Sequence, residues 1–209
     1  MTLVRDRPID DQVIENQALR VRRLGGPTST SYFSVDSQAV RSQTEFVSET
    51  AYLSLGSNLG DRAANLRTAV ARLEDAGKVL AVSALYETQP VDVPNQPWFL
   101  NCVAAIDTSM TPRELLQFAL QVEATMGRLR LSEKGARKID IDVVLFGDRV
   151  WDEPGLKIPH PAMHQRRFVL EPLVEIAPQA RHPEFGKTAR ELLAELLAAL
   201  PAGQTVRRL

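Results

Sequence analysis

Apolar and polar residues alternate in two stretches of this chain, and each alternation predicts a β-strand. In residues 51–55 and again in residues 139–142, every second residue is apolar. Because successive side chains of a strand point to opposite faces, Asp140 and Asp142 are expected on one face of the second strand. The isoleucines between them then face a core, and the strand continues through the apolar residues 143–146.

Apolar residues at helical spacing predict two helices between these strands. Leu66, Val70 and Leu73 form one face of the first helix. The second begins at the sequence T-P-R-E of residues 111–114, which is typical of a capping box with proline in the first turn, and extends to about residue 126.

The order of the predicted elements indicates the fold class. Further strands are expected at 79–86 and 99–106, a short edge strand at 150–151, and helical segments at 159–176 and 188–200. The order β-α-β-β-α-β followed by helices is that of a split βαβ arrangement. We therefore predict an α+β fold with a ferredoxin-like βαββαβ core, additional C-terminal helices and three α/β/α layers.

Composition divides the chain into two parts. Residues 1–48 are polar and lack steady periodicity, which predicts a mobile N-terminal extension. It is either an unstructured leader or a segment that docks on the domain or on a partner. Residues 49–209 are expected to form the folded domain.

Charge and cysteine content exclude several classes of protein. The formal net charge of the 209 residues is −1, which does not favour binding of nucleic acid or membrane by the whole surface. A single cysteine excludes a disulfide framework and a cysteine-based zinc site, and it fits a reducing, cytoplasmic location. No apolar run approaches the roughly 18–20 residues that span a bilayer, and the first residues lack the apolar core of a secretory signal.

Candidate chemistry lies around the second alternating strand. A basic loop precedes it and carries several cations, which are Arg128, Arg130, Lys134, Arg137 and Lys138. Paired carboxylates suit hard divalent metals, and arginines suit phosphate oxygens, so the combination favours metal–polyphosphate chemistry. A strand-end D-x-D beside a solvated basic loop is the structural alternative. The P-loop motif is absent from the sequence, which closes that route to phosphate binding.

Six short motifs occur in a fixed order along the chain. They are L-G-S-N-L-G-D-R at 55–62, Y-E-T-x-P at 86–90, F-L-N at 99–101, G-R-x-R at 127–130, G-A-R-x-x-D-x-D at 135–142 and I-P-H-P-x-M-x-x-R-x-F-V-L-x-P-L at 158–173. Together they resemble the 6-hydroxymethyl-7,8-dihydropterin pyrophosphokinases of the folate pathway over roughly residues 50–200. The resemblance implies a monomeric enzyme that transfers the terminal diphosphate of ATP to the pterin hydroxymethyl group and releases AMP.

The resemblance also implies roles on the nucleotide side. Asp140 and Asp142 would hold two Mg²⁺ ions that bridge the ATP phosphates, and Asp142 would help to deprotonate the substrate hydroxyl. Arg128 and Arg130 would act in catalysis by closing over the phosphates. The implied ATP-binding residues are Glu123, Arg137, His160 and Arg166. A solvated helix carboxylate is the alternative for Glu123.

On the pterin side, the resemblance implies that Phe99 and Phe168 sandwich the ring and that Asn101 hydrogen-bonds its edge. Backbone groups near Thr88 and Val91 would complete the rim. Phe99 and Phe168 could instead be simple core residues.

The chain departs from the family pattern in and near the basic loop. Lys134 stands where many relatives have an aromatic residue, Ala136 where proline is frequent, and the loop is about one residue shorter. Gln89 also replaces a frequent proline. The rival hypothesis for the whole chain is a non-catalytic ferredoxin-like module that binds nucleotide or RNA.

Overall fold

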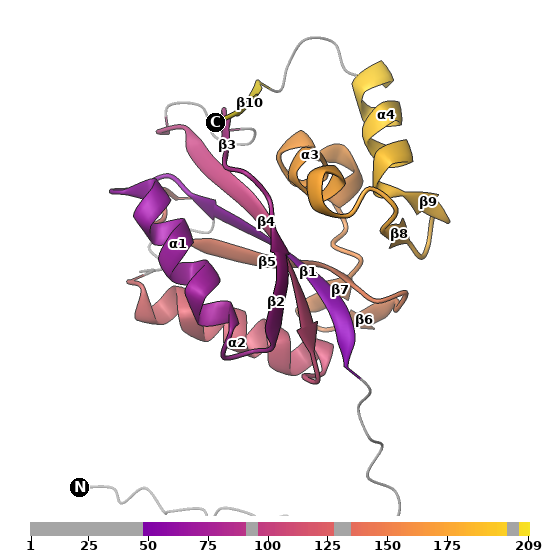
Figure 1. Ribbon diagram of the computed structural model, residues 1–209, viewed down its shortest axis with the longest axis horizontal. Helices are drawn as coiled ribbons and strands as arrows, with labels where there is room; N and C mark the ends of the chain where they lie inside the picture. The colour runs from indigo at the N-terminus through magenta and orange to yellow at the C-terminus, as the bar shows by residue number, and fades with distance from the viewer. Residues whose placement is uncertain (1–47, 91–95, 128–134, 200–204) are drawn as a thin grey trace, which may run out of the picture. The chain divides into compact units, whose positions relative to one another are not determined.

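The computed structural model describes residues 48–90, 96–127, 135–199 and 205–209 (Figure 1). They belong to one compact unit, Thr44–Leu209. Apart from Ser48, the predicted mobile extension lies outside the described residues, and its prediction stays open. The described residues form a mixed α/β domain with four α-helices and an antiparallel main sheet. In this part of the chain, no helix combines the length and the apolar character needed to cross a membrane.

The main sheet has β1 near its centre and β5 at one edge. Its strands are β1 (Glu49–Ser57), β2 (Lys78–Val82), β3 (Tyr86–Thr88), β4 (Phe99–Thr108), β5 (Asp140–Phe146) and β10 (Val206–Arg208). They follow the order β10-β3-β4-β1-β5, and every pairing is antiparallel. Strand β2 also pairs with β4, along a later part of β4 than the part that pairs with β3. The antiparallel pairing agrees with the predicted α+β class.

Helices α1 (Arg62–Leu73) and α2 (Pro112–Thr125) cover one face of this sheet (Figure 1). The predicted capping box is confirmed, because Thr111 Oγ1 accepts from the Glu114 backbone N–H at 3.2 Å and the Glu114 carboxylate accepts from the Thr111 N–H at 2.7 Å. The apolar stripes of both helices join the buried side chains of β1, β4 and β5 in the larger core.

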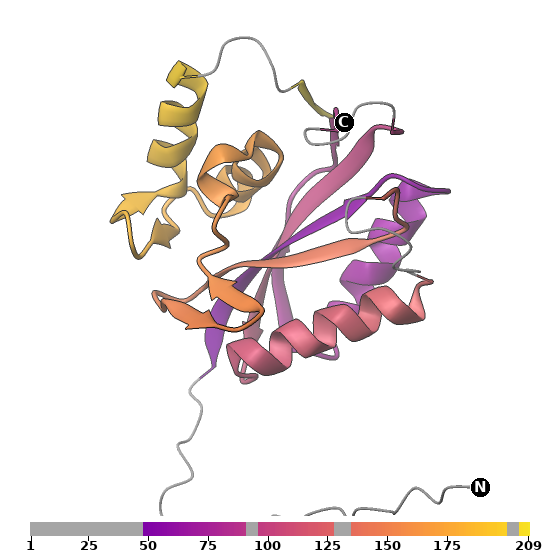
Figure 2. The same cartoon turned by 180° about the vertical axis from the view of Figure 1, so that it is seen from behind.

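Helix α3 (Arg167–Ile176) packs on the other face, and α4 (Ala189–Ala199) packs against α3, as the view from behind also shows (Figure 2). Their core includes Val103 of β4 and Val144 of β5. Smaller elements complete the domain, and these are the 3-10 turn Met163–Gln165 and the hairpins β6–β7 (Trp151–Glu153, Leu156–Ile158) and β8–β9 (Arg181–His182, Lys187–Thr188).

Three predicted elements differ from the structure. The strand expected at 79–86 is divided into β2 and β3, because the Ser83 hydroxyl replaces a backbone carbonyl in accepting from the Val103 N–H at 3.0 Å. The segment expected to be helical from 159 becomes so only at Met163, because Pro159 and Pro161 disfavour the helical conformation of the residues before them. The short edge strand is β6 of a separate hairpin, and β10 was not predicted.

Candidate active site

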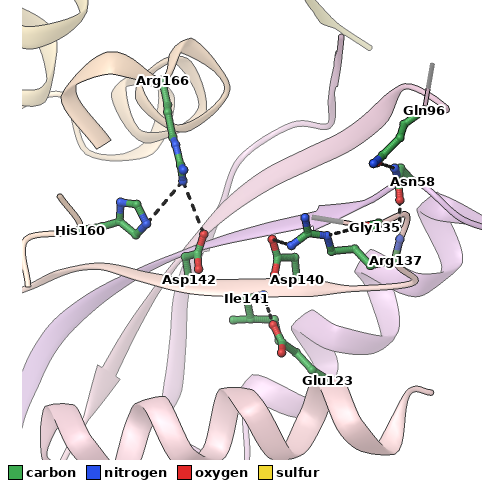
Figure 3. Close-up of polar contacts among 10 residues, drawn as sticks. All are labelled: Asn58, Gln96, Glu123, Gly135, Arg137, Asp140, Ile141, Asp142, His160 and Arg166. Carbon is green, nitrogen blue, oxygen red and sulfur yellow. Dashed lines mark hydrogen bonds and ion pairs between the residues drawn. The ribbon is translucent and has the colours of Figure 1, made fainter. Parts of the chain in front are cut away.

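The carboxylates of Asp140 and Asp142 lie on one face of β5 (Figure 3). Both side chains are partly exposed, whereas Ile141 and Val143 are 2% and 5% exposed. The predicted alternation of this strand is therefore confirmed. On β1, Gly56 lies opposite Asp140.

Arg137 is fixed beside Asp140 by its side chain and by its backbone. Its Nη1 donates to Asp140 Oδ2 at 2.7 Å, and its Nε donates to the Gly135 carbonyl at 3.2 Å. Asn58 holds the Arg137 backbone twice: its Oδ1 accepts from the Arg137 N–H at 2.7 Å, and its own N–H donates to the Arg137 carbonyl at 3.1 Å. The guanidinium thus has a set position beside Asp140.

Two further cationic or donor groups converge on Asp142 from the start of α3 and the segment before it. Arg166 Nη1 lies 3.9 Å from Asp142 Oδ2 and 3.4 Å from His160 Nε2 (Figure 3). His160 Nδ1 accepts from the Ala162 N–H at 3.1 Å, which assigns the proton of a neutral imidazole to Nε2. Arg166 and His160 therefore offer N–H groups at one place, which suits an anion.

Desolvation and mutual repulsion both act on the two aspartates. Although 42% of the Asp142 side chain is exposed, the surrounding protein desolvates its carboxylate, and this together with the charge of Asp140 raises its pKa. Burial lowers the pKa of His160, so its imidazole favours the neutral form. Two close carboxylates on a rigid strand can hold a divalent cation through oxygen. The described residues contain no larger metal-binding group, that is, no cluster of three or more His, Cys, Asp or Glu side chains that could hold a metal ion.

Of the residues expected on the pterin side, Thr88, Phe99 and Asn101 lie on β3 and β4, and Phe168 lies in α3. Asn101 Nδ2 donates to Thr88 Oγ1 at 2.8 Å, and both residues are 3% exposed. Phe99 pairs with Thr88 across the β3–β4 ladder. A Cβ atom on Gly56 would lie 2.7 Å from Asn101 Oδ1, so only glycine leaves room for this amide. Gly56 pairs with both Asn101 and Asp140, and the row across β4, β1 and β5 joins the two sides of the site.

The two aromatic rings each lie near an arginine. The Arg137 Cζ is 6.0 Å from the centroid of the Phe99 ring, and the Arg166 Cζ is 5.6 Å from that of Phe168. Both rings are only partly buried, unlike the core residues of the neighbouring strands. Phe99 belongs to neither core, whereas Phe168 also packs against the core of α3 and α4, so the core alternative stays open for Phe168.

The sequence did not predict that Asn58 and Arg62 hold neighbouring segments in place through hydrogen bonds. Asn58 is 2% exposed, and its Nδ2 donates to Gln96 Oε1 at 3.1 Å and to the Pro97 carbonyl at 3.4 Å. Arg62 donates through Nη1 to the Trp98 carbonyl at 2.7 Å. Its Nη2 also pairs with a glutamate of β3 at 2.9 Å. The motif at 55–62 was the available signal, because it places both side chains directly after β1.

Glu123 does not join the other predicted ATP-binding residues. It projects from α2 on the opposite side of β5 from Asp140 and Asp142 (Figure 3). It is 2% exposed, and its Oε1 accepts from the Ile141 backbone N–H at 2.7 Å. The alternative of a solvated carboxylate is wrong, because the edge of β5 provides a buried donor.

Three predicted site residues lie outside the described residues. They are Val91, Arg128 and Arg130.

Residues 52–178 match the family described as 7,8-dihydro-6-hydroxymethylpterin-pyrophosphokinase (HPPK). The chain belongs to this family. The 2-amino-4-hydroxy-6-hydroxymethyldihydropteridine pyrophosphokinase of Methylorubrum extorquens is 48% identical over 149 residues, which cover 70% of this chain and 92% of that protein. The protein of the same name from Pseudomonas aeruginosa is 41% identical over 152 residues, covering 72% and 91% of the two chains.

Longer relatives contain a similar segment. The Folic acid synthesis protein fol1 of Schizosaccharomyces pombe is 43% identical over 148 residues, but this chain spans only 20% of its length. The crystal structure of wild-type HPPK-DHPS from Plasmodium falciparum superposes with a TM-score of 0.61 at 18% identity, covering 72% of this chain and 45% of that one. At that identity the likeness concerns the fold alone.

Proposed function

We propose that this chain transfers the terminal diphosphate of ATP to the hydroxymethyl group of 6-hydroxymethyl-7,8-dihydropterin, releasing AMP and forming the pterin diphosphate for folate biosynthesis. Membership of the HPPK family supports both the reaction and its two substrates. The observation that supports placing this reaction here is the row Asn101–Gly56–Asp140 across three strands. At one end of the row, the Asn101 amide lies near an aromatic ring that could stack on the pterin. At the other end, the Asp140 carboxylate lies near cations that could bind phosphate.

Asp140 and Asp142 are proposed to hold two Mg²⁺ ions. Support comes from their carboxylate oxygens on one strand face and from the burial and the repulsion by Asp140 that raise the pKa of Asp142. When bound, the ions would neutralise the triphosphate and orient its β-phosphorus for in-line attack. With two protein carboxylates, the remaining ligands are expected to come from phosphate oxygens and water.

The chain's own cations and donors are proposed to bind the phosphates. Arg137 and Arg166 would bind from set positions, and His160 would donate through its Nε2–H to a phosphate oxygen. Asp142 would help to accept the proton of the substrate hydroxyl, because its carboxylate lies on the strand face where the phosphates are proposed to bind. Arg128 and Arg130 stay predictions from the motif G-R-x-R.

The pterin would bind between Phe99 and Phe168, with its edge at Asn101. The Thr88 hydroxyl already takes one amide proton of Asn101, which fixes the orientation of the amide. Asn101 Oδ1 would then accept from a pterin N–H. The contacts near Thr88 and Val91 stay predictions.

Glu123 is proposed to position β5 rather than to bind ATP. Support comes from its burial and from its hydrogen bond to the Ile141 N–H on the far side of the strand. The carboxylate would hold the segment between the two aspartates in place.

We further propose that the core, β1 through β5 with α1 and α2, is ferredoxin-like with helical layers on both faces, and that residues 49–209 are the catalytic domain. The element order and the position of α3 and α4 support this arrangement. We expect the chain to act as a monomer on small molecules, which light scattering of the purified protein would test.

The deciding experiment is an assay for AMP. We expect AMP to form only when ATP, Mg²⁺ and the hydroxymethylpterin are present together. Release of ADP, or AMP formation without the pterin, would contradict the proposal. Retention on single-stranded RNA without pterin-dependent AMP formation would favour the non-catalytic module.

A further inference from the structure

The strand β10 closes the edge of the sheet next to the proposed pterin site (Figure 1). It pairs antiparallel with β3, so that Val206 lies opposite Thr88 and Arg208 lies opposite Tyr86. Two backbone hydrogen bonds extend the ladder, from Gln89 N–H to the carbonyl of residue 205 at 3.3 Å and from the N–H of residue 209 to the carbonyl of residue 85 at 2.9 Å. This strand lies outside residues 52–178, which match the family.

The partner strand β3 is short and carries a residue of the proposed pterin site. It has three residues, and Thr88 at its end accepts the hydrogen bond from Asn101 Nδ2. Thr88 is held on one side by Phe99 of β4 and on the other by Val206 of β10. Without β10, the position of Thr88 would depend on a single three-residue ladder, and such short edges open readily.

Side chains tie β10 to helix α3 as well. Arg208 Nη2 pairs with Glu175 Oε1 at 2.8 Å, and the Tyr86 hydroxyl donates to Glu175 Oε2 at 2.7 Å. The Ala84 N–H also donates to this carboxylate, at 3.2 Å. Glu175 thus joins β10, the segment around β3 and α3, the helix that begins beside Arg166.

The charges around Glu175 are mutually satisfied. Burial alone would raise the pKa of Glu175, but the hydrogen bonds from Tyr86 and Arg208 outweigh it and hold that pKa below its usual value. Desolvation and the neighbouring carboxylate raise the pKa of Tyr86 to about 12, so its hydroxyl stays a donor at neutral pH. The connection therefore persists over the range in which the protein would work.

We propose that β10, held by Arg208 and Glu175, is a positioning element for the pterin side of the active site. It would fix β3, and through Thr88 the amide of Asn101, while leaving the phosphate side untouched. This inference rests on the proposed function and deepens it. It predicts a division of kinetic effects, with the KM for the pterin depending on β10 and the KM for ATP independent of it.

The test compares the full chain with a variant that ends at residue 204 and with Arg208→Gln. We expect the shortened variant to raise the KM for the pterin about tenfold, the equivalent of roughly 1.4 kcal/mol. For Arg208→Gln we expect about threefold, because an ion pair to an exposed arginine is weak. The KM for ATP should stay unchanged in both, and Arg208→Lys should recover part of the effect.

Arg207→Gln is the matched control. Arg207 lies on the same strand with its side chain on the opposite face, and among the described residues no ion pair involves it. Its substitution should leave both KM values and the midpoint of thermal unfolding unchanged.

The outcomes separate this inference from the proposed function. A full chain that forms no pterin-dependent AMP overturns both. An active full chain whose Arg208→Gln variant keeps the original KM for the pterin overturns the inference alone, even if the shortened variant fails to fold. A parallel rise of both KM values in the folded Arg208→Gln variant would also overturn it, because that would indicate a general structural effect.

Discussion

The two faces of β5 are surrounded by different chemistry. On one face, Ile141 and Val143 are buried in the core that α1 and α2 cover. On the other, Asp140 and Asp142 meet arginine and histidine side chains and remain partly exposed. Full burial of an aliphatic side chain stabilises by about 1.5–3 kcal/mol. The difference shows how a strand keeps two carboxylates together. Its apolar face anchors the backbone, so desolvation and the repulsion by Asp140 raise the pKa of Asp142 while the strand stays in place.

The largest expected effect comes from removing either carboxylate on the polar face of β5. We expect Asp142→Asn and Asp140→Asn each to lower the rate of AMP formation about 10²- to 10³-fold, because a ligand for the bridging cations is lost. The midpoint of thermal unfolding should not fall for Asp142→Asn, because burial and the charge of Asp140 disfavour its ionised form. Asp140→Asn should lower the midpoint slightly, because it weakens the contact with Arg137. Rates within about threefold of the original, for both variants, would contradict the metal assignment.

Removing the hydrogen bond between Glu123 and β5, on the apolar side of the strand, should reduce stability instead. We expect Glu123→Ala to lower the free energy of unfolding in urea by about 1–3 kcal/mol, because the Ile141 N–H loses its buried acceptor. Glu123→Gln, which keeps an acceptor, should lower it less. If either variant unfolds like the original but has a raised KM for ATP, Glu123 binds the nucleotide and the positioning assignment is wrong.

Asn58 links the polar face of β5 to the segment before β4. We expect Asn58→Ala to lower kcat/KM about tenfold for both substrates, because Arg137 loses one backbone partner while Gln96 and Pro97 lose a donor. As the comparison variant, Gln96→Ala removes one contact of Asn58 and leaves both of its bonds to Arg137 in place, so it should lower kcat/KM less than Asn58→Ala. An unaltered kcat/KM for ATP in Asn58→Ala would contradict the proposed link between the two sides of the site.

The smallest effect should come from the cap of α2, which lies on the apolar side only. We expect Thr111→Ala to lower the free energy of unfolding by about 1 kcal/mol, as is usual for the loss of an N-cap, with both KM values unchanged. Ser109→Ala, an exposed hydroxyl two residues earlier, is the control and should leave stability unaltered. A changed KM in Thr111→Ala would show that the two faces are not independent.

Local patterns made the polar face of β5 and the start of α2 predictable. The alternation around Asp140 and the spacing of Thr111 and Glu114 each lie within a few residues, where backbone geometry alone decides which groups meet. The contact of Glu123 with Ile141 was not predictable, because it joins residues 18 positions apart through burial that depends on the whole domain.

Pairing between distant segments explains the other misses. The ladder of β10 with β3 joins residues about 120 positions apart, and the three residues of β10 carry no alternation that marks a strand. The division of the strand expected at 79–86 depended on one hydroxyl, at Ser83, taking the place of a carbonyl. The motifs gave the order of the site residues, but not which backbone atoms hold them.

The hydrogen bond from Arg62 to the carbonyl of Trp98 has a practical consequence. The chain contains two tryptophans, and Trp98 is 38% exposed and directly precedes Phe99. In a Trp151→Phe background, all indole fluorescence would come from this one tethered position. Its emission would then report the polarity around the incoming pterin, giving an optical signal of ligand arrival that needs no attached dye and no turnover.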